Sequence, residues 1–182
     1  GDQKVLDHVN DARLLGVIKD SDNRFAGKRS WDFDVVTQGW RYHMSDIMAA
    51  IGIVQLKRLP NFAKRRQLLA THYDGLLCQN PDLKTLPQDY SQVVPHIYPV
   101  ILPIGTDRHE LMRRMLESSI QVGIHYQPNH RLGLYKSENN DDLSVVEALS
   151  MRLLSLPLHP DLVLADLEVV VDTLNKNLSE MA

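Results

Sequence analysis

A run of apolar residues at helical spacing constrains this chain of 182 residues more than any other feature. It runs from Asp46 to about Leu59, and Ser45 or Asp46 can cap its first turn with a side-chain oxygen. Its apolar positions cover more than one face of the helix: Ile47, Ala50, Ile51, Val54 and Leu56. We therefore expect this helix to be buried on several sides.

Pro60 follows directly, and a proline inside a helix removes a hydrogen bond and breaks or kinks the helix. A second helical pattern over 61–78 then places apolar residues on one stripe: Phe62, Leu69, Tyr73, Leu76 and Leu77. The two patterns together predict a long bent helical element that bridges two domains. The charged cluster at 57–66, "KRLPNFAKRR", is typical of a solvated helix face rather than of a nucleic-acid patch.

The remaining patterns predict a small α/β domain in the second half of the chain, because strands alternate there with helices. Asp107 with Glu110 forms a pattern typical of a helix start, and Gly16 stands where an amino-terminal helix would end. Helices are expected over 3–15, 106–120, 143–154 and 163–179, and strands over 96–103 and 121–126.

The composition is that of an ordinary globular protein, with 43% hydrophobic and 24% charged residues. A net charge of -3 gives no reason to expect nucleic acid as a partner, and no apolar run reaches membrane-spanning length. Cys78 is the single cysteine, so an internal disulfide is impossible and a reducing, cytoplasmic location is expected. The chain starts without a methionine, which is typical of a cleavage product or a partial sequence.

Charged and aromatic residues gather in "KRSWDFDVVTQGWRYHMSD", residues 28–46. Arg41 precedes a helix start, where guanidinium donors and free backbone N–H groups could converge on a phosphate. Lys28, Arg29 and Trp31 add charge and flat apolar surface nearby. A dimer or domain interface anchored by the aromatic residues is an equally good interpretation, and the two do not exclude each other.

A second group stands in "GIHYQPNH", residues 123–130, where His125, Tyr126 and His130 follow an expected strand. Loops at strand ends commonly carry function, so a substrate-facing loop is one interpretation, and structural histidines are the other. A metal site is disfavoured, because Pro128 excludes a regular helix face and no cysteine or carboxylate is near in sequence. In "PHIYPV", His96 and Tyr98 would lie on the same side of a strand.

These motifs, in this order, resemble the DegT/StrS-type family of nucleotide-sugar aminotransferases, and the resemblance covers essentially the whole chain. The segment "GWRYHMSDIMAAIGIVQLKRL" (39–59) is similar to a family segment that reads Gly-aromatic-x-Tyr-x-Met-Ser-Asp-Ile. The resemblance continues in "RRQLLATHYDGLL" (65–77) and "GIHYQPNH" (123–130), and it ends in "LSMRLLSLPLHPDL" (149–162).

The resemblance implies a pyridoxal-phosphate enzyme of the aspartate-aminotransferase fold that acts as a homodimer. This chain would be the carboxyl-terminal portion: residues 1–45 would form the tail of the large domain and a dimer-interface loop, 46–78 the bent interdomain helix, and 79–182 the small α/β domain. The lysine that binds the cofactor covalently is expected upstream, and the isolated chain is expected to be inactive. None of the lysines present stands in the corresponding context: Lys4, Lys19, Lys28, Lys57, Lys64, Lys84, Lys136 and Lys176.

The resemblance also implies roles for residues of this chain. Arg41 matches a position, often asparagine in the family, that reaches the cofactor phosphate of the neighbouring subunit. His125, Tyr126 and His130 match a loop that faces the sugar nucleotide, while Lys28, Arg29 and Trp31 would lie near its diphosphate. No metal is expected.

The expected reaction moves an amino group from an amino acid such as glutamate onto a dTDP- or UDP-linked 4-keto-6-deoxyhexose, in polysaccharide biosynthesis. This requires a homodimer or pairing with a separate amino-terminal half. A truncated, non-catalytic dimerisation or binding module is the alternative.

Overall fold

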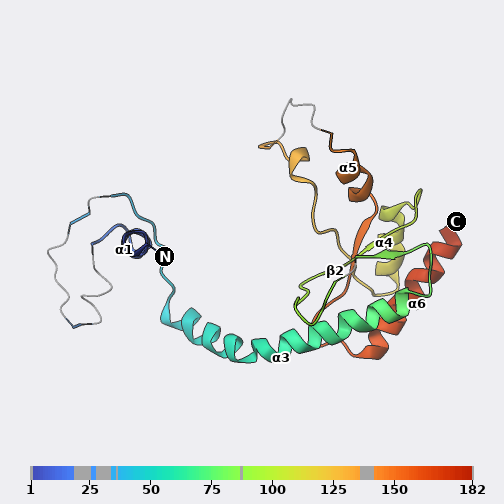
Figure 1. Cartoon of the computed structure of the whole chain (residues 1–182), viewed down its shortest axis with the longest axis horizontal. Helices are drawn as coiled ribbons and strands as arrows, with labels where there is room; N and C mark the ends of the chain where they lie inside the picture. The colour runs from blue at the N-terminus through green and yellow to red at the C-terminus, as the bar shows by residue number, and fades with distance from the viewer. Residues whose placement is uncertain are drawn as a thin grey trace. The chain divides into compact units, whose positions relative to one another are not determined.

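The computed structural model of the chain describes residues 2–18, 26–27, 34–35, 37–86, 88–135 and 142–181. Figure 1 shows the order of its helices and strands along the chain. By the density of internal contacts the chain divides into two compact units, residues 1–57 and 58–182. Among the described helices, none combines the length and apolar character needed to cross a bilayer.

The predicted helices and the 96–103 strand are present, with shorter or shifted bounds, so the mixed α/β class is confirmed. The elements are α1 (Gln3–Ala12), α3 (Asp46–Leu77), β1 (Lys84–Thr85), β2 (Tyr98–Ile101), α4 (Arg108–Glu117), η1 (Asn129–Arg131), α5 (Ser144–Ser150), β3 (Leu153–Leu156) and α6 (Leu164–Met181). The helix expected over 143–154 ends at Ser150 because the chain turns there into strand β3. The strand expected over 121–126 is wrong, since only Gly123 pairs, through a single bridge to Ser155.

In the amino-terminal unit, α1 begins at Gln3 with Asp2 as its cap, whose carboxylate accepts a 2.9 Å hydrogen bond from the Lys4 N–H. The helix ends at Ala12, three residues earlier than the sequence predicts. Leu15 and Gly16 both adopt positive φ, at 64° and 76°. The reversal at these two residues lets the chain after α1 pair with a later segment instead of continuing the helix.

Helix α3 begins after Ser45, whose hydroxyl accepts a 3.3 Å hydrogen bond from the Met48 N–H. Of the two candidate caps, Ser45 is therefore the one that the chain uses. Pro60 lies inside the helix and does not end it. A proline removes only one N–H and crowds one preceding carbonyl, so the intact hydrogen bonds on either side of Pro60 carry the helix through.

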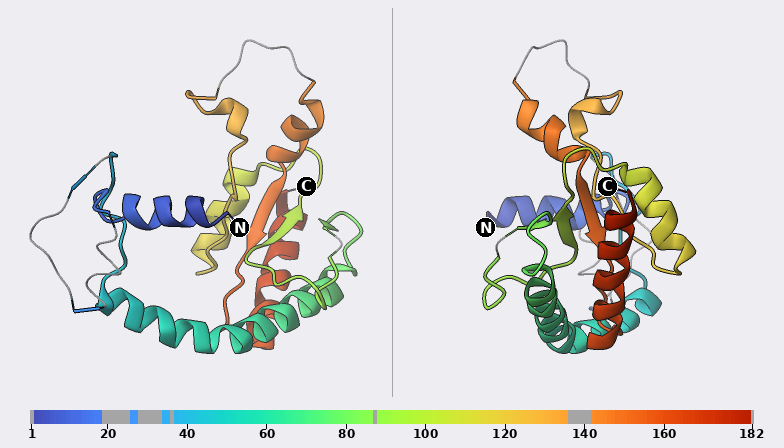
Figure 2. Two further views of the ribbon diagram at one scale, coloured as in Figure 1. Left: turned by 60° about the vertical axis from the view of Figure 1, so that its left-hand side comes forward. Right: turned by 90° about the vertical axis from the view of Figure 1, so that its right-hand side faces the viewer.

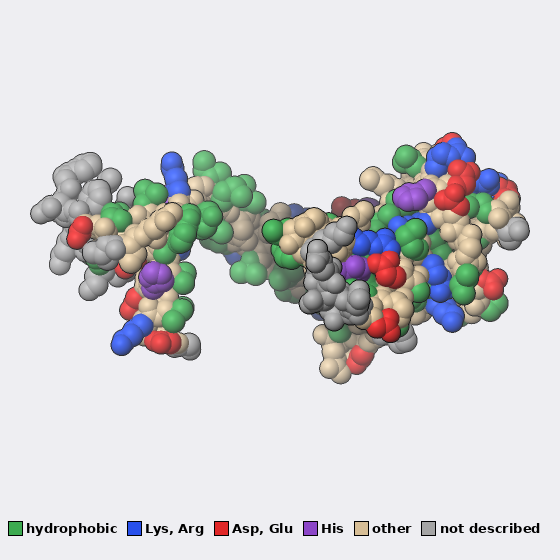
Figure 3. Space-filling model, turned by 90° about the horizontal axis from the view of Figure 1, so that it is seen from above, with side chains coloured by type: hydrophobic (Ala, Val, Ile, Leu, Met, Phe, Trp, Pro, Cys, Tyr) green, Lys and Arg blue, Asp and Glu red, His purple; other side chains and the backbone are tan. Residues whose placement is uncertain are grey.

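The prediction that the first half of α3 is buried on several sides is wrong for the isolated chain. Ile47 is 74% exposed, Val54 54% and Leu56 69%. Val5, Leu6 and Val9 of α1 are also more than half exposed, and the left-hand part of Figure 3 shows hydrophobic side chains gathered on the surface of this unit. Patches this apolar are typical of surfaces that another protein part covers, because each such side chain gains about 1.5–3 kcal/mol on burial.

The carboxyl-terminal unit contains a three-stranded antiparallel sheet in the order β1-β2-β3. Tyr98 pairs with Leu156 and Val100 with Leu154, so β2 and β3 are in register along their full lengths. Tyr98 and Val100 are buried while the residues between and after them are half-buried, which is the alternation expected of a strand with one face in the core. His96 lies outside the strand and is exposed, so it does not share the buried side with Tyr98.

Three helices complete the core of this unit, and α4 packs against α6 (Figure 2). Asp107 caps α4 as predicted, accepting from the His109 and Glu110 N–H groups, whereas the Glu110 carboxylate pairs with Arg113 and Arg114. The second half of α3 contributes the stripe that its spacing predicts, with Leu69, Tyr73 and Leu77 fully buried. The buried residues of α4 and α6 in the core are Leu111, Met115, Leu167, Val170, Val171 and Leu174.

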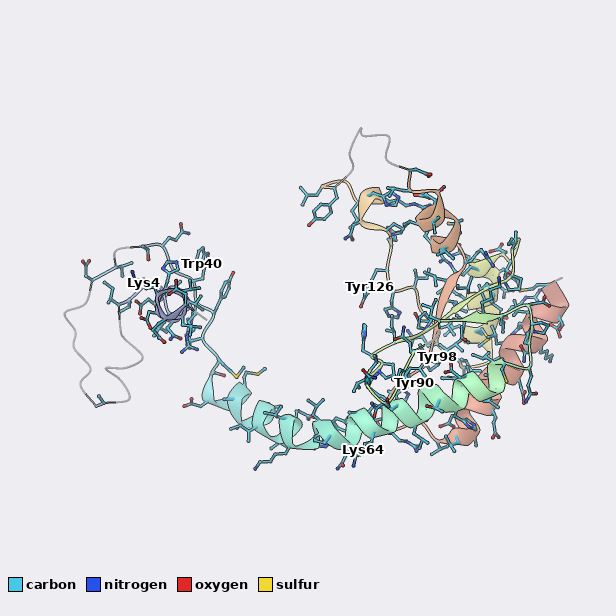
Figure 4. The ribbon with its side chains drawn as sticks, in the orientation of Figure 1. Lys4, Trp40, Lys64, Tyr90, Tyr98 and Tyr126 are labelled. Atoms are coloured by element: carbon cyan, nitrogen blue, oxygen red, sulfur yellow. The ribbon has the colours of Figure 1, made fainter. Side chains whose placement is uncertain are left out.

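Two buried tyrosines join α3 to the sheet. The rings of Tyr73 and Tyr98 stack with centroids 4.7 Å apart. The Tyr98 hydroxyl donates a short hydrogen bond to Asp74, and the Tyr73 hydroxyl donates to the Pro157 carbonyl at 3.0 Å. Figure 4 shows Tyr98 and Tyr90 beside the helix. Both hydroxyls are thereby satisfied, so the aromatic pair is held without the penalty of an unpaired buried polar group.

We expect the unfolding free energy of this unit to fall as the pH rises above about 10. Burial, with the charge of Asp166, raises the pKa of Tyr73 above its ordinary value, and burial with the Asp74 hydrogen bond does the same for Tyr98. Above about pH 10 the unfolded chain releases these protons and the folded chain keeps them, so alkali favours unfolding. Tyrosinate absorbance should therefore rise in two phases, with the later phase accompanying the loss of helical circular dichroism.

Tyr98→Phe should reduce the amplitude of the later phase, and Tyr135→Phe, at a residue that is 59% exposed, should not. Ionisation of all six tyrosines of the chain while the helices stay intact would contradict this account.

Candidate functional site

Arg41 lies in a short extended segment that pairs with the residues after α1. The Trp40 N–H donates to the Ala12 carbonyl at 2.7 Å, and the Tyr42 N–H donates to the Arg13 carbonyl at 2.9 Å. The Leu15 N–H donates in return to the Trp40 carbonyl at 3.0 Å. Figure 4 shows Trp40 beside α1. These backbone bonds fix the path of the "GWRYHMS" motif, although most of its side chains are exposed.

Two glycines permit this pairing. A Cβ atom on Gly39 would lie 2.0 Å from the backbone nitrogen of Gly16, and a Cβ on Gly16 would lie 2.3 Å from the Thr37 carbonyl oxygen. Real Cβ atoms do not approach backbone atoms this closely, so both positions need glycine for their close backbone contact. The glycine that opens the motif therefore has a structural reason that the sequence pattern alone does not reveal.

The side chains of this segment alternate in direction, as in any extended chain. The rings of Trp40 and Tyr42 stack at 6.2 Å with an angle of 8° between their planes. Arg41, between them, is exposed and precedes the first residue of α3 by five positions. A fixed backbone that presents a guanidinium is suited to phosphate or carboxylate recognition, because the guanidinium can donate two hydrogen bonds in a fixed geometry.

In the carboxyl-terminal unit, His125 lines a cavity of about 340 Å3 beside β3. The cavity is bordered by polar residues that come from three segments of the chain, namely His96, Gln121, His125 and Ser155. The sequence singled out His125, while the contributions of Gln121 and Ser155 follow from the single bridge to β3. Tyr126 is 75% exposed and meets the His125 ring edge to face at 5.1 Å.

Gly123 holds His125 at this cavity. Its N–H donates to the Ser155 carbonyl at 3.0 Å, and its carbonyl accepts from the Ser155 N–H at 2.8 Å. The His125 ring lies over Gly123, where a Cβ atom would come within 2.9 Å of the ring Cε1 atom. The glycine thus provides the space that the imidazole ring occupies.

Arg66 of α3 binds two of the residues that line this cavity. Its guanidinium donates to the His96 carbonyl and to the Leu158 carbonyl, each at 3.0 Å. These carbonyls belong to two different segments that border the cavity, so one cation holds both segments to the same helix.

His130, the third residue singled out in this loop, does not have a free ring. Its Nε2 atom lies 2.5 Å from a carboxylate oxygen of Glu147 in α5. Arg131 next to it binds the same carboxylate, with its Nε atom 3.0 Å from the oxygen. The structure therefore places His125 and His130 in different surroundings, and it adds Glu147, which no sequence motif indicated.

The other predicted contacts cannot be placed in the same way. Lys28, Arg29 and Trp31 lie outside the described residues. The lysines that are described are all exposed: Lys4, Lys57, Lys64, Lys84 and Lys176. Within the described part of the chain, no three histidine, cysteine, aspartate or glutamate side chains come together as they would around a metal ion.

Comparison with known proteins gives one family over nearly the whole chain. The model of the DegT/DnrJ/EryC1/StrS aminotransferase family matches residues 1–175. The chain spans about half the length of the curated relatives that it matches, with 45% coverage of the first of them.

Two curated relatives and one solved structure illustrate the match. A UDP-4-amino-4,6-dideoxy-N-acetyl-beta-L-altrosamine transaminase of Campylobacter jejuni is 31% identical over 94% of the chain and 45% of its own length. A dTDP-4-dehydro-2,3,6-trideoxy-D-glucose 4-aminotransferase of Saccharopolyspora spinosa is 34% identical over 85% of the chain and 40% of its own length. The aminotransferase PseC of Helicobacter pylori superimposes with a TM-score of 0.85, at 23% identity, over 98% of this chain and 47% of that one.

Gly39→Ala should break the pairing of the Arg41 segment, because the new methyl group would meet backbone atoms that cannot move aside singly. We expect the Trp40 and Tyr42 amides to exchange with solvent at least about tenfold faster, which corresponds to about 1.4 kcal/mol. Gly52→Ala is the matched control, since nothing lies within 4 Å of its Cβ position in α3. Equal exchange rates in the two variants would refute the steric role of Gly39.

Gly123→Ala should displace the His125 ring and leave the bridge to Ser155 in place, because the ring can rotate away from the new methyl group. In NMR spectra the His125 ring signals should shift while the Ser155 amide signal stays. Gly133→Ala, which has nothing within 4 Å of its Cβ position, serves as the control. Unchanged His125 ring signals would show that Gly123 does not position the ring.

Proposed function

The chain belongs to the DegT/DnrJ/EryC1/StrS aminotransferase family, and from this we propose that it is the carboxyl-terminal portion of a nucleotide-sugar aminotransferase subunit. The substrate is a dTDP- or UDP-linked keto-deoxysugar, with a 4-keto-6-deoxyhexose favoured, and the amino donor is an amino acid such as glutamate. The observation that carries this proposal is the match of the family model over residues 1–175. The names of the relatives from Campylobacter jejuni and Saccharopolyspora spinosa support both nucleotides.

The cofactor of the complete enzyme is pyridoxal phosphate. When bound, it supplies the electron sink that amino-group transfer requires. The residues present fit its phosphate, because Arg41 offers a permanent cation on a backbone held by three hydrogen bonds. We assign Arg41 to the phosphate bound by the neighbouring subunit of a homodimer.

The covalent attachment of the cofactor requires a lysine, and we propose that it comes from a part of the subunit outside these 182 residues. The described lysines support this, since all of them lie on the surface of helices or of the edge strand β1. The isolated chain is then inactive in transamination. A non-catalytic dimerisation module would also be inactive, and it would remain so after assembly with an amino-terminal part.

The proposed amino-terminal portion of the subunit also accounts for the apolar surface of the amino-terminal unit. The exposed side chains of α1 and of the first half of α3 include Val5, Leu6, Val9, Ile47 and Ile51. At about 1.5–3 kcal/mol for each buried side chain, covering them favours assembly strongly. We propose that the amino-terminal portion of the subunit covers this surface, and that residues 1–45 act as large-domain tail and dimer-interface loop.

The sugar nucleotide is assigned to the loop over 123–130. His125 and Tyr126 offer a ring nitrogen, a hydroxyl and flat surface beside a cavity, which suits the hydroxyl groups and apolar faces of a sugar. His130, whose ring lies beside Glu147, is assigned to the same sugar nucleotide. Lys28, Arg29 and Trp31 are assigned to the neighbourhood of the diphosphate.

Within this scheme the chain's own residues bind and orient. Arg41 would hold the phosphate of the cofactor bound by the neighbouring subunit. The His125 imidazole, which lies over Gly123, would hydrogen-bond the sugar and orient it. Such orientation lowers the activation barrier, because the entropy of alignment is lost on binding rather than in the reaction itself.

Replacing Arg41 by Met should weaken cofactor binding in the enzyme assembled with its amino-terminal portion. Hydrogen bonds to charged groups contribute about 1.5–3 kcal/mol, so we expect pyridoxal phosphate to bind about 10- to 100-fold less tightly. Arg41→Lys should retain part of the affinity, and Arg13→Met, which removes a neighbouring exposed arginine, should retain all of it. The measurement is a titration of the cofactor absorbance, together with the rate of glutamate-dependent amination of the nucleotide sugar.

An unchanged affinity of Arg41→Met for pyridoxal phosphate would contradict the assignment of Arg41 to the cofactor phosphate. Absence of cofactor absorbance and of transamination in the assembled wild type would remove the proposed function itself.

A further inference from the structure

Glu147 of α5 contacts His130 and Arg131, so it ties α5 to the end of the loop assigned to the substrate. It projects from α5, accepts a hydrogen bond from Arg131 at the end of η1, and has a carboxylate oxygen 2.5 Å from the His130 Nε2 atom. The contact with Arg131 is two-pronged, since the Nε atom binds one carboxylate oxygen at 3.0 Å and a terminal nitrogen lies close to the other. Two-pronged pairs of this kind fix direction as well as distance.

The helix that carries Glu147 is itself fixed. The guanidinium of Arg108, which is 8% exposed, donates to the Ser150 carbonyl at 2.5 Å and to the Leu153 carbonyl at 3.0 Å. The Ser150 hydroxyl donates back to the Glu147 carbonyl at 3.0 Å. The carboxylate is therefore held to the core of the unit through a buried cation at the end of α5.

The carboxylate is ionised at neutral pH. Hydrogen bonds from Arg131, and then from His130, lower the pKa of Glu147 to about 2. An ionised carboxylate can only accept hydrogen bonds, so the His130 Nε2 atom, 2.5 Å away, must carry the proton. In a neutral imidazole the other nitrogen, Nδ1, is then an acceptor with no proton.

We propose that Glu147 is a positioning residue that holds His130 as the Nε2–H tautomer, so that Nδ1 is the ring atom that accepts a hydrogen bond from a hydroxyl group of the sugar. This rests on the proposed function for the identity of the ligand, whereas the tautomer is a property of the chain itself. The arrangement is specific, because the opposite tautomer would place the lone pair of Nε2 against the carboxylate. Arg131 contributes by keeping the carboxylate charged and aligned.

The tautomer can be read directly by NMR on the 182-residue chain labelled with 15N-histidine, at a pH where the imidazole is neutral. The two ring nitrogens of a neutral histidine have distinct shifts according to which one carries the proton, and His130→Gln identifies the signals. We expect a protonated Nε2 and an unprotonated Nδ1 for His130. In Glu147→Ala the two forms should become mixed, with the Nε2 and Nδ1 shifts moving toward each other.

Glu117→Ala is the matched control, because Glu117 also pairs with an arginine, Arg113, on a helix of the same unit. It should leave the His130 signals unchanged. An Nδ1–H tautomer in the wild type, or a His130 spectrum that is the same in Glu147→Ala and the wild type, would overturn the proposal. A variant that merely unfolds is recognised by the loss of the dispersed amide spectrum, and Glu147→Leu, which removes both acceptor oxygens but keeps most of the side-chain volume, then replaces it.

In the assembled enzyme, Glu147→Ala should raise the KM for the nucleotide sugar about tenfold, as expected for one misdirected hydrogen bond of about 1.4 kcal/mol, with little change in the KM for the amino donor. An unchanged KM for the sugar would overturn the role of His130 in sugar binding. If the wild-type assembly has no transaminase activity, the proposed function fails, and the NMR result still decides whether Glu147 sets the tautomer.

Discussion

The attachment of α3 to the sheet by Tyr73, Tyr98 and Asp74 is the interaction on which the rest of the carboxyl-terminal unit depends. Tyr98 is paired in register with Leu156, so fixing Tyr98 on α3 also fixes β3. Strand β3 in turn holds Gly123 through Ser155, and the His125 ring lies over that glycine. The position of the candidate sugar-binding histidine is thus traceable to a buried aromatic pair whose hydroxyls are both satisfied.

The amino-terminal unit differs from the carboxyl-terminal unit, because its backbone is held by hydrogen bonds while its apolar side chains are exposed. Hydrogen bonds from 12–15 to 40–42 and two glycines in close backbone contact set the path of the Arg41 segment. The same unit presents valine, leucine and isoleucine side chains to solvent at helical spacing. We interpret the amino-terminal unit as one piece of a larger domain. Its backbone path is already set, and the rest of the subunit would bury its apolar side chains.

Much of this fold was predictable, because helix patterns and caps are local. The stripe Leu69, Tyr73 and Leu77 and the cap at Asp107 follow from spacing alone. The failures depend on distant contacts: 121–126 forms one bridge to Ser155 instead of a strand, and the first half of α3 is exposed in this chain. Glu147 could not be found from sequence, since its partners stand 16 and 17 residues earlier and no motif links them. Arg41, His125, Tyr126 and His130 were singled out by residue type and position, the family resemblance added functional roles for them, and these roles stay predictions.

The central claim is that this chain works as part of a larger aminotransferase subunit that covers α1 and the first half of α3. Hydrogen–deuterium exchange tests it most directly, by comparing the 182-residue chain with the protein isolated from its own cells. We expect at least about tenfold slower exchange over 3–12 and 46–57 in the protein isolated from cells, because covered helices open less often. Equal exchange over both segments, together with an intact mass of 20.8 kDa, would contradict it.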